Sequence, residues 1–356
     1  MAGISIEALL GRFKGCMLGA LAGDCLGAPF EMDSSVALSV LNNYINKLAD
    51  PKVRVPYKAF TDDTAMTQSV AQSLIDEKSF SEVDMAKKFV RAYYKEPRRG
   101  YGANIVNVFA ALKATNFKDV WAPAALQFDG SGSYGNGGAM RVAPVALFTA
   151  AASTEEAINM ARDSALITHS HAQGYNGAIL QCLAVRNALL SPSSSLNPQE
   201  YVEGLISTLS KMRNPREEDQ DLCSEGEGHG GFVDSLHVLQ ELLGRSDQVT
   251  REEVVERLGN DVSAINSVPT AIYAFLRALQ PIQGIESDSE FLRSIVYAIS
   301  LGGDTDTIAS MAGAIAGAYH GSQGVPEFLG RHCEAWEGAL QQAEELHKIV
   351  YKNDKP

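Results

Sequence analysis

The organisation of this chain is set by one short stretch between two apolar helical runs. That stretch reads Ser300-Leu301-Gly302-Gly303-Asp304-Thr305-Asp306-Thr307. Before it, apolar residues recur at helical spacing from Phe291 to Ile299, and the glycine pair then breaks the pattern. Either Asp304 or Thr305 suits the N-cap position of the following helix. The stretch therefore ends one helix, begins another, and places two carboxylates at the junction.

A second acidic cluster lies far away in the sequence and has the same form. Thr61-Asp62-Asp63-Thr64 stands directly before a run in which Met66, Val70 and Leu74 recur four apart. One interpretation is that the two clusters are independently capped helix starts. The other is that they are two halves of one site for a hard cation, since carboxylates and hydroxyls suit Mg²⁺, Mn²⁺ or Ca²⁺. From spacing alone the two interpretations weigh about equally.

Electrostatic repulsion among the four aspartates supports the interpretation as a cation site. If Asp62, Asp63, Asp304 and Asp306 lie close together, they repel one another too strongly to stay ionised without cations between them. Two ions about 3.5–4 Å apart fit four or five shared oxygen ligands. The spacing excludes an EF-hand. The five cysteines are scattered without a C-x-x-C pair, which disfavours zinc and a disulfide framework and favours a reducing compartment.

Composition sets the class of protein. The chain has 356 residues, of which 45% are apolar and 21% charged, so it can bury a large core. Its net charge of −13 argues against binding to nucleic acid or anionic membrane, and no apolar run is long enough to span a bilayer. We find almost no β-alternation, no repeat and no clear linker. The sequence predicts one compact all-α domain over residues 1–356, and nothing in it demands an oligomer, so a monomer is expected.

Two helical runs carry faces of small residues. Near the start, Gly15, Gly19 and Gly23 recur every fourth residue, which stacks them on one side of a helix. Near the end stands a similar face, Ala312-Gly313-Ala314-Ile315-Ala316-Gly317-Ala318. Glycine destabilises a helix interior by about 1 kcal/mol relative to alanine, so such a face indicates close helix approach. We expect these two helices to pack against each other in the core.

The remaining periodicity predicts helices through most of the chain. Their expected positions are 36–46, 61–114 with a break at 97–100, 141–151, 154–168, 175–190, 198–212, 232–243, 251–258, 268–279, 290–299, 307–320 and 326–350. Residues 214–231 are polar, acidic and glycine-rich, so we expect a surface loop there.

A glycine-rich segment precedes the expected helix at 141. It reads Phe128-Asp129-Gly130-Ser131-Gly132-Ser133-Tyr134-Gly135-Asn136-Gly137-Gly138-Ala139-Met140-Arg141. It contains G-x-G-x-x-G, but no strand precedes it and no acidic residue stands about 20 positions later, which argues against a dinucleotide-binding fold. A flexible connector is one interpretation. We prefer a binding loop whose backbone N–H groups wrap a diphosphate, because five glycines lie directly before a helix.

Two further residues are candidates on weaker grounds. Glu31 follows a helix that Pro29 ends, in a loop free to move, although an ordinary exposed glutamate is the alternative. His169 and His171 do not share a helix face, which disfavours a metal pair. His169 either lines a pocket or caps the preceding helix.

Taken together, these segments resemble the ADP-ribosylhydrolases, the dinitrogenase reductase-activating glycohydrolase-like superfamily. The resemblance rests on residues 23–31, Thr61-Asp62-Asp63-Thr64, the 130–141 loop and residues 302–307, and it spans essentially the whole chain. The 131–141 segment, Ile167-Thr168-His169, Gly174-Tyr175-Asn176-Gly177-Ala178 and Ser267-Val268-Pro269-Thr270-Ala271-Ile272-Tyr273 most resemble the vertebrate branch that removes ADP-ribose from serine.

The resemblance implies a set of site residues. It implies orthogonally packed helices around a dinuclear metal site that holds two Mg²⁺ ions, or Mn²⁺ in their place. The implied metal ligands are Glu31, Thr61, Asp62, Asp63, Asp304, Asp306 and Thr307. The implied substrate contacts are Phe128, Ser131, Gly132, Ser133, Tyr134, Gly135, Asn136, Gly137, His169 and Val262, with the loop on the diphosphate and Val262 on the adenine side. Glu31 and Asp62 are the implied catalytic residues.

The resemblance also implies an activity. The expected reaction is Mg²⁺-dependent hydrolysis of the O-glycosidic C1″ bond of ADP-ribose on protein serine, with poly(ADP-ribose) and O-acetyl-ADP-ribose as further substrates, in reversal of ADP-ribosylation after DNA damage. The implied compartments are nucleus and cytoplasm, with the mitochondrial matrix as a third, against which the short N-terminal extension argues. The alternatives are a module that binds ADP-ribose without cleaving it and a hydrolase of ADP-ribosylarginine.

Overall fold

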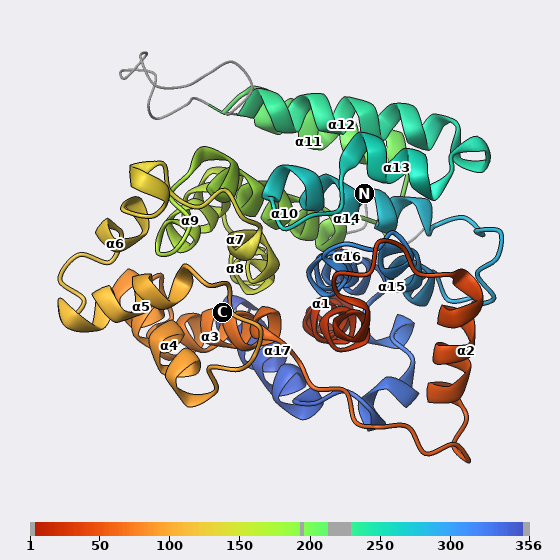
Figure 1. Ribbon diagram of the computed structural model, residues 1–356, viewed down its shortest axis with the longest axis horizontal. Helices are drawn as coiled ribbons and strands as arrows, with labels where there is room; N and C mark the ends of the chain where they lie inside the picture. The colour runs from red at the N-terminus through yellow and green to blue at the C-terminus, as the bar shows by residue number, and fades with distance from the viewer. Residues whose placement is uncertain (1–3, 193–195, 213–228, 352–356) are drawn as a thin grey trace.

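The computed structural model describes residues 4–192, 196–212 and 229–351 of the chain (Figure 1). The longer helices are α1 (Ile6–Gly27), α2 (Leu38–Ala49), α3 (Asp62–Glu77), α4 (Glu82–Lys95), α5 (Ile105–Ala114), α9 (Thr154–Leu166), α10 (Ala172–Leu190), α11 (Pro198–Ser210), α12 (His229–Gly244), α13 (Arg251–Leu258), α14 (Ala264–Arg277), α15 (Glu290–Ser300), α16 (Thr305–His320) and α17 (Trp336–Tyr351). The short helical segments are η1 (Ala28–Phe30), α6 (Ala122–Ala125), η2 (Phe128–Gly130), α7 (Gly137–Met140), α8 (Ala143–Phe148), η3 (Ser246–Gln248), η4 (Ser322–Gly324) and η5 (Glu327–Arg331). The described residues contain two isolated β-bridges and no named strand, which confirms the all-α prediction.

The core is built around α1 and α16, which lie side by side in the middle of the molecule (Figure 1). A Cβ atom added to Gly19 would lie 2.0 Å from the carbonyl oxygen of Gly313, and one added to Gly15 would lie 2.2 Å from that of Gly317. The two helices therefore run antiparallel with their backbones in contact. The predicted packing of the two small-residue faces is confirmed.

The other helices cover this pair. Helix α15 precedes α16 and packs beside it, α17 packs on α1 and α3, and α10 and α14 pack on α16. Helices α11, α12 and α13 form an outer layer over α14 and α10 (Figure 1). No helix among the described residues is long and apolar enough to cross a membrane.

The structure differs from the predicted elements at several places. The predicted run 61–114 has a second break, at Lys78 with a φ of 55°, between α3 and α4. The predicted helix at 326–350 is confirmed from 336 on, as α17, but it is wrong before that residue. There a 3₁₀ segment ends at Arg331, Cys333 pairs with Lys58 in a parallel bridge, and Ala335 has a φ of 62°. Helix α8 is shorter than 141–151. Helix α14 begins at 264 rather than 268, and it contains Pro269 among fully buried neighbours, so packing outweighs the missing N–H donor. The predicted loop at 214–231 lies outside the described residues up to 228, and its last three residues belong to α12.

The contact between α1 and α16 generates a stability prediction. In Gly19→Ala the new methyl group meets the backbone of α16, so we expect the free energy of unfolding to fall by about 1–3 kcal/mol or more. In the matched variant Gly204→Ala, inside α11, no atom lies within 4 Å of the new Cβ, so a gain of about 0.5–1 kcal/mol is expected. Urea unfolding followed by circular dichroism measures both, and equal effects at the two positions would contradict the close packing.

Candidate metal and ligand site

The starts of α3 and α16 meet at one cavity. The hydroxyl of Thr307 donates a hydrogen bond to Oδ2 of Asp63 at 3.1 Å, although the two residues are 244 positions apart. Thr61 caps α3 by accepting from the N–H of Asp63. Asp304 occupies the N-cap position of α16, yet its side chain makes no capping hydrogen bond. Two independently capped helix starts therefore do not account for the arrangement, and the two acidic clusters share one site.

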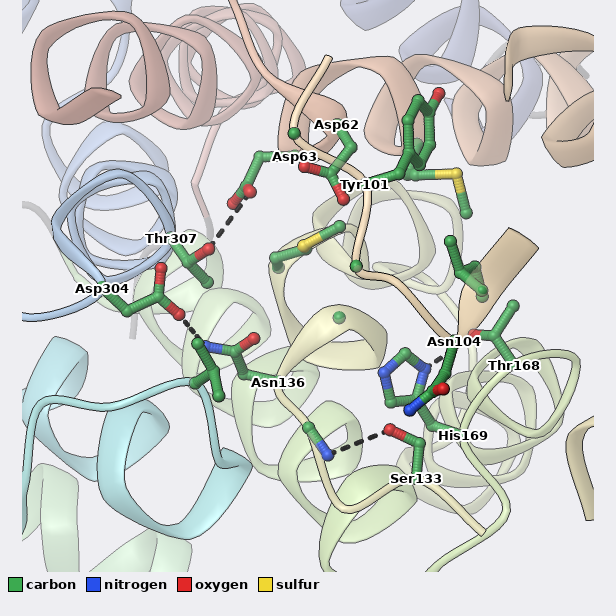
Figure 2. Close-up of a pocket in the computed structure, with 18 of the residues that line it drawn as sticks. Asp62, Asp63, Tyr101, Asn104, Ser133, Asn136, Thr168, His169, Asp304 and Thr307 are labelled. Carbon is green, nitrogen blue, oxygen red and sulfur yellow. Dashed lines mark hydrogen bonds between the residues drawn. The ribbon is translucent and has the colours of Figure 1, made fainter. Parts of the chain in front are cut away.

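Three carboxylates in this site form a compact group. Glu31, Asp304 and Asp306 each place one carboxylate oxygen within 4.8 Å of the other two. Asp304 and Asp306 are buried, whereas Glu31 is exposed at the end of η1. Asp62 and Asp63, from the start of α3, lie on the same side of the cavity as this group (Figure 2).

These carboxylates form no ion pair within the described residues, although Arg141 lines the same cavity and interacts electrostatically with Asp62. Among the described residues, no lysine, arginine or histidine forms an ion pair with any of the five. Oδ1 of Asp63 is buried and has no hydrogen-bond partner. Buried carboxylates without compensation are unfavourable, and a divalent cation with oxygen ligands supplies the missing charge. The residues present therefore fit a hard metal ion.

The same crowding raises the pKa values of the carboxyl groups. Burial raises the pKa of Asp62 and Asp63 well above the usual range, and the charges of Asp24 and Asp306 raise the pKa of both further. Burial and then the charge of Asp304 raise the pKa of Asp306 to about 7. Burial and the charge of Asp306 raise the pKa of Glu31. The location of Asp62, Asp63 and Asp306 in the first turns of their helices opposes these shifts, because the helix dipole favours negative charge there.

Asp24 holds the start of α3 in place. This residue of α1 is fully buried, and its carboxylate accepts the N–H of Thr61 at 3.0 Å, the N–H of Thr64 at 3.0 Å and the hydroxyl of Thr64 at 2.6 Å. It thus binds the backbone on both sides of Asp62 and Asp63. Sequence reasoning did not assign Asp24 a role. The signal available was a charged residue inside an otherwise apolar helix.

A second set of contacts fixes the other side of Asp62. Its N–H donates to the carbonyl oxygen of Arg99 at 2.7 Å. The guanidinium of Arg99 forms two hydrogen bonds with Glu334, at 2.7 and 2.8 Å, and stacks on the ring of Phe60. This bidentate, partly buried pair is a rigid support for the acidic segment. No local signal in the sequence identified Arg99 or Glu334.

The Asp304 side is held by the glycine pair and by two asparagines. The Asn136 side chain donates to Oδ2 of Asp304 at 2.6 Å, and the N–H of Asp304 donates to the carbonyl of Asn260 at 2.8 Å. Gly302 and Gly303 have φ angles of 74° and 72°, and a Cβ on Gly303 would lie 2.1 Å from the Asn260 carbonyl oxygen. Glycine is required here because both the backbone angle and the space exclude a side chain.

The loop that carries Glu31 is tied down rather than free. The N–H of Met32 donates to the carbonyl of Gly303 at 2.9 Å, and the N–H of Gly303 donates to the carbonyl of Asp33 at 2.7 Å. The sequence suggested a mobile loop, but these two bonds join it to the glycine pair at the start of α16. The backbone next to Glu31 is therefore held against the start of α16.

The glycine-rich loop forms the far wall of the cavity. The cavity has a volume of about 310 Å³. Of the residues predicted to bind metal or substrate, those that line it are Glu31, Asp62, Asp63, Phe128, Ser133, Tyr134, Gly135, Asn136, Gly137, His169, Val262, Asp304, Asp306 and Thr307. Figure 2 shows the acidic residues on one side of the opening and Ser133 and His169 on the other.

Three predicted residues do not line the cavity. Thr61 lies behind the acidic segment as the cap of α3. Ser131 donates its hydroxyl to the carbonyl of Phe128 at 2.9 Å, and Gly132 packs against Ser170, so closely that a Cβ would lie 2.1 Å from its hydroxyl oxygen. The roles of Ser131 and Gly132 as ligand contacts remain predictions.

Val262 is joined to the glycine loop by backbone hydrogen bonds. Its carbonyl accepts the N–H of Asn136 at 2.9 Å, and the Tyr134 carbonyl accepts the N–H of Ala264 at 3.0 Å. Its side chain is 58% exposed at the rim of the cavity. A segment more than a hundred residues downstream thus completes the wall that the loop begins.

The sequence profile of the ADP-ribosylglycohydrolase family matches residues 5–356. The chain belongs to this family. It is 46% identical over 350 residues to ADP-ribosylhydrolase ARH3 of Bos taurus, with 97% of this chain and 94% of the relative covered. It is 45% identical to the protein of the same name from Homo sapiens (97% and 95% covered) and 39% identical to that of Danio rerio (96% and 90% covered).

A solved structure agrees with the fold. A protein described as an ADP-ribosylglycohydrolase-related protein complex superimposes with a TM-score of 0.65 at 21% identity, and the match covers 97% of this chain and 99% of that chain. Family membership and the all-α fold therefore rest on independent comparisons. Within an ADP-ribosylglycohydrolase, the acidic cavity is the candidate active site.

Metal binding should be visible as a pH-dependent change in stability. The folded state holds the protons of Asp62, Asp63 and Asp306 more tightly than the unfolded chain does. Proton binding by these groups therefore stabilises the fold, and this stabilisation is complete below about pH 4. It is lost as the pH rises through the raised folded-state pKa, about 7 for Asp306. We therefore expect Mg²⁺ to raise the unfolding temperature by several degrees, and more at about pH 8 than at about pH 5.

Differential scanning fluorimetry in chelator and in Mg²⁺ tests this expectation, with an equal ionic strength of KCl as the control for screening. A shift that is absent, or that KCl reproduces, would contradict the metal site.

Asp24 gives a prediction about positioning. In Asp24→Asn the amide group faces at least one of the three donors, so we expect the free energy of unfolding to fall by about 1–3 kcal/mol. The stabilisation by Mg²⁺ should shrink as well, because the start of α3 loses its support. The matched control is Asp76→Asn, at the exposed end of the same helix, where a surface pair contributes about 0–1 kcal/mol. If both variants respond alike to Mg²⁺, Asp24 does not position the site.

Proposed function

We propose that the protein is a Mg²⁺-dependent hydrolase that cleaves the O-glycosidic C1″ bond of ADP-ribose attached to protein serine, and that also acts on poly(ADP-ribose) and O-acetyl-ADP-ribose. The observation that carries this proposal is the cavity, which has a cluster of carboxylates without an ion pair among the described residues on one wall and a glycine-rich loop on the other. The 39–46% identity to proteins named ADP-ribosylhydrolase supports the same chemistry.

The proposed metal ligands are Glu31, Thr61, Asp62, Asp63, Asp304, Asp306 and Thr307. When bound there, two Mg²⁺ ions, or Mn²⁺ in their place, supply positive charge and Lewis acidity for activating water and fixing ribose hydroxyls. The Thr307–Asp63 hydrogen bond keeps ligands from both helix starts within one site.

Two residues are proposed to act in the reaction. Glu31 lies on the exposed side of the cavity with a raised pKa, which suits a group that takes a proton from water and passes it toward the leaving oxygen. Asp62 orients the water or the ribose, and its backbone is fixed by the Arg99 carbonyl. The transition state resembles an oxocarbenium ion, as in other glycoside hydrolysis.

The far wall is proposed to hold the nucleotide. The loop from Ser131 to Gly137 is proposed to bind the diphosphate. The N–H groups of Ser131, Gly132 and Asn136 already donate to backbone carbonyls, so the remaining N–H groups of the loop would make this contact. Phe128 and Tyr134 present rings 6.0 Å apart, tilted by 38° and each 46% exposed, so they flank the mouth where the ligand enters. Val262 lies on the adenine side, and His169 contacts the ligand from below the loop.

The biological setting is proposed from the resemblance. We propose that the protein acts as a single-domain monomer, in nucleus and cytoplasm and by extension in the mitochondrial matrix, and that it reverses ADP-ribosylation after DNA damage. The family resemblance supports this setting. Its partners are then serine-modified proteins and the polymer itself.

The activity is tested by release of ADP-ribose from a serine-modified peptide and from an arginine-modified peptide, each with Mg²⁺ and with chelator. We expect release from serine alone, abolished by chelator. In Asp304→Asn the rate should fall by about 100-fold or more, because a metal ligand that also binds Asn136 is lost. The matched control is Asp234→Asn, an exposed position on α12 away from the cavity, which should keep the wild-type rate.

Each other outcome has a definite meaning. Release from arginine would assign the protein to a different branch of the family. Binding of ADP-ribose without release from any substrate would show a recognition module. A normal rate for Asp304→Asn would refute the proposed metal ligands.

A further inference from the structure

His169 reaches the cavity with only one of its two ring nitrogens. Nδ1 lies 2.7 Å from the hydroxyl oxygen of Thr168. The other side of the ring faces the glycine loop, where a Cβ on Gly137 would lie 2.9 Å from Nε2 and one on Gly135 would lie 3.5 Å away. Figure 2 shows Thr168 on one side of the ring and the open part of the pocket on the other. The nitrogen that can meet a ligand is therefore Nε2.

Thr168 decides which ring nitrogen carries the proton. Its hydroxyl oxygen accepts a hydrogen bond from the guanidinium of Arg141 at 2.7 Å, and a guanidinium can only donate. The single hydroxyl hydrogen is then left for either Nδ1 of His169 or the carbonyl of Ala165. That carbonyl is 3.5 Å away and already accepts the N–H groups of Thr168 and His169, at 3.0 and 2.8 Å. The hydroxyl therefore donates to Nδ1, and the proton of a neutral ring resides on Nε2.

Arg141 cannot easily leave this arrangement. Its side chain is 1% exposed, it donates also to the carbonyl of Ser164 at 3.1 Å, and its guanidinium stacks on the ring of Phe89. Within the described parts of the chain no carboxylate forms an ion pair with it. This buried cation lines the cavity on the wall that is proposed to receive an anionic ligand, and it feels the charge of Asp62 without forming an ion pair with it.

We propose that Arg141 and Thr168 are positioning residues that hold His169 as the Nε2–H tautomer, so that the ring donates a hydrogen bond to an acceptor oxygen of a nucleoside diphosphate sugar in the cavity. The identity of the ligand rests on the proposed function, whereas the tautomer does not. The ring stays neutral at physiological pH, because burial and then the charge of Arg141 lower the pKa of His169 to about 3. A neutral ring with the proton on Nε2 can donate to a diphosphate or ribose oxygen. No lone pair of the ring then faces that oxygen.

The tautomer is read directly by ¹⁵N NMR of histidine-labelled protein, metal-free and without ligand. His169→Gln identifies the signal among the seven histidines. We expect a protonated Nε2 and an unprotonated Nδ1 in the wild type. Thr168→Val, which has nearly the same shape but no hydroxyl, should lose this pattern, and Thr168→Ser should restore it. A wild-type signal with the proton on Nδ1 would overturn the proposal, whatever the variants show.

Binding of ADP-ribose in Mg²⁺, measured by calorimetry, tests the donor role. We expect Thr168→Val to bind about tenfold more weakly, since one hydrogen bond is lost or misaligned, and Thr168→Ser to bind close to wild type. Equal affinities of wild type and a folded Thr168→Val would overturn the donor role. Absence of binding to the wild type would overturn the ligand assignment together with the proposed function, and the NMR signal would still judge the tautomer separately.

Discussion

The backbone contact between α1 and α16 is the constraint on which the candidate site depends. Gly15, Gly19 and Gly23 allow an approach so close that any Cβ would overlap the opposing backbone. A contact of this kind permits one register, because a shift would drive a side chain into a carbonyl group. In that register Gly27, at the end of α1, lies against Asp306 at the start of α16. The close contact between the backbones of α1 and α16 therefore fixes the position of the acidic start of α16.

Asp24 fixes the position of the start of α3 in the same way. It lies on α1 one turn before Gly27, and its carboxylate binds the backbone around Asp62 and Asp63. Helix α3 is therefore positioned relative to α1, which is positioned relative to α16. Chemical sites built on packed helices hold their geometry better than sites on free loops. The segment that carries Glu31 is held in the same way, because its backbone forms hydrogen bonds with the glycine pair before α16.

The two walls of the cavity differ in charge, and the residues on each wall explain why. On one wall, carboxylates gather that form no ion pair among the described residues, and either bound protons or a bound cation compensates their charge. On the other wall, a buried Arg141, a neutral His169 and the N–H groups of a glycine loop present donors and positive charge. A ligand with an anionic diphosphate at one end and ribose hydroxyls at the other matches this polarity. The net charge of −13 contributes nothing to such recognition, which is entirely local.

The sequence by itself determined the features that depend on near neighbours. Helical periodicity, the break at Gly302 and Gly303, the cap at Thr61 and the small-residue faces are all set within four residues, so they could be predicted. The proposed metal ligands and substrate contacts came from the resemblance of the sequence motifs to those of the ADP-ribosylhydrolases. Only the tertiary structure decided the contacts that join distant segments, such as Asn136 with Asp304 across 168 positions or Arg99 with Glu334 across 235. It also delayed the start of the predicted helix at 326–350 to Trp336, because Cys333 pairs with Lys58 instead. These outcomes depend on which helices become neighbours, and that is fixed only when the whole core packs.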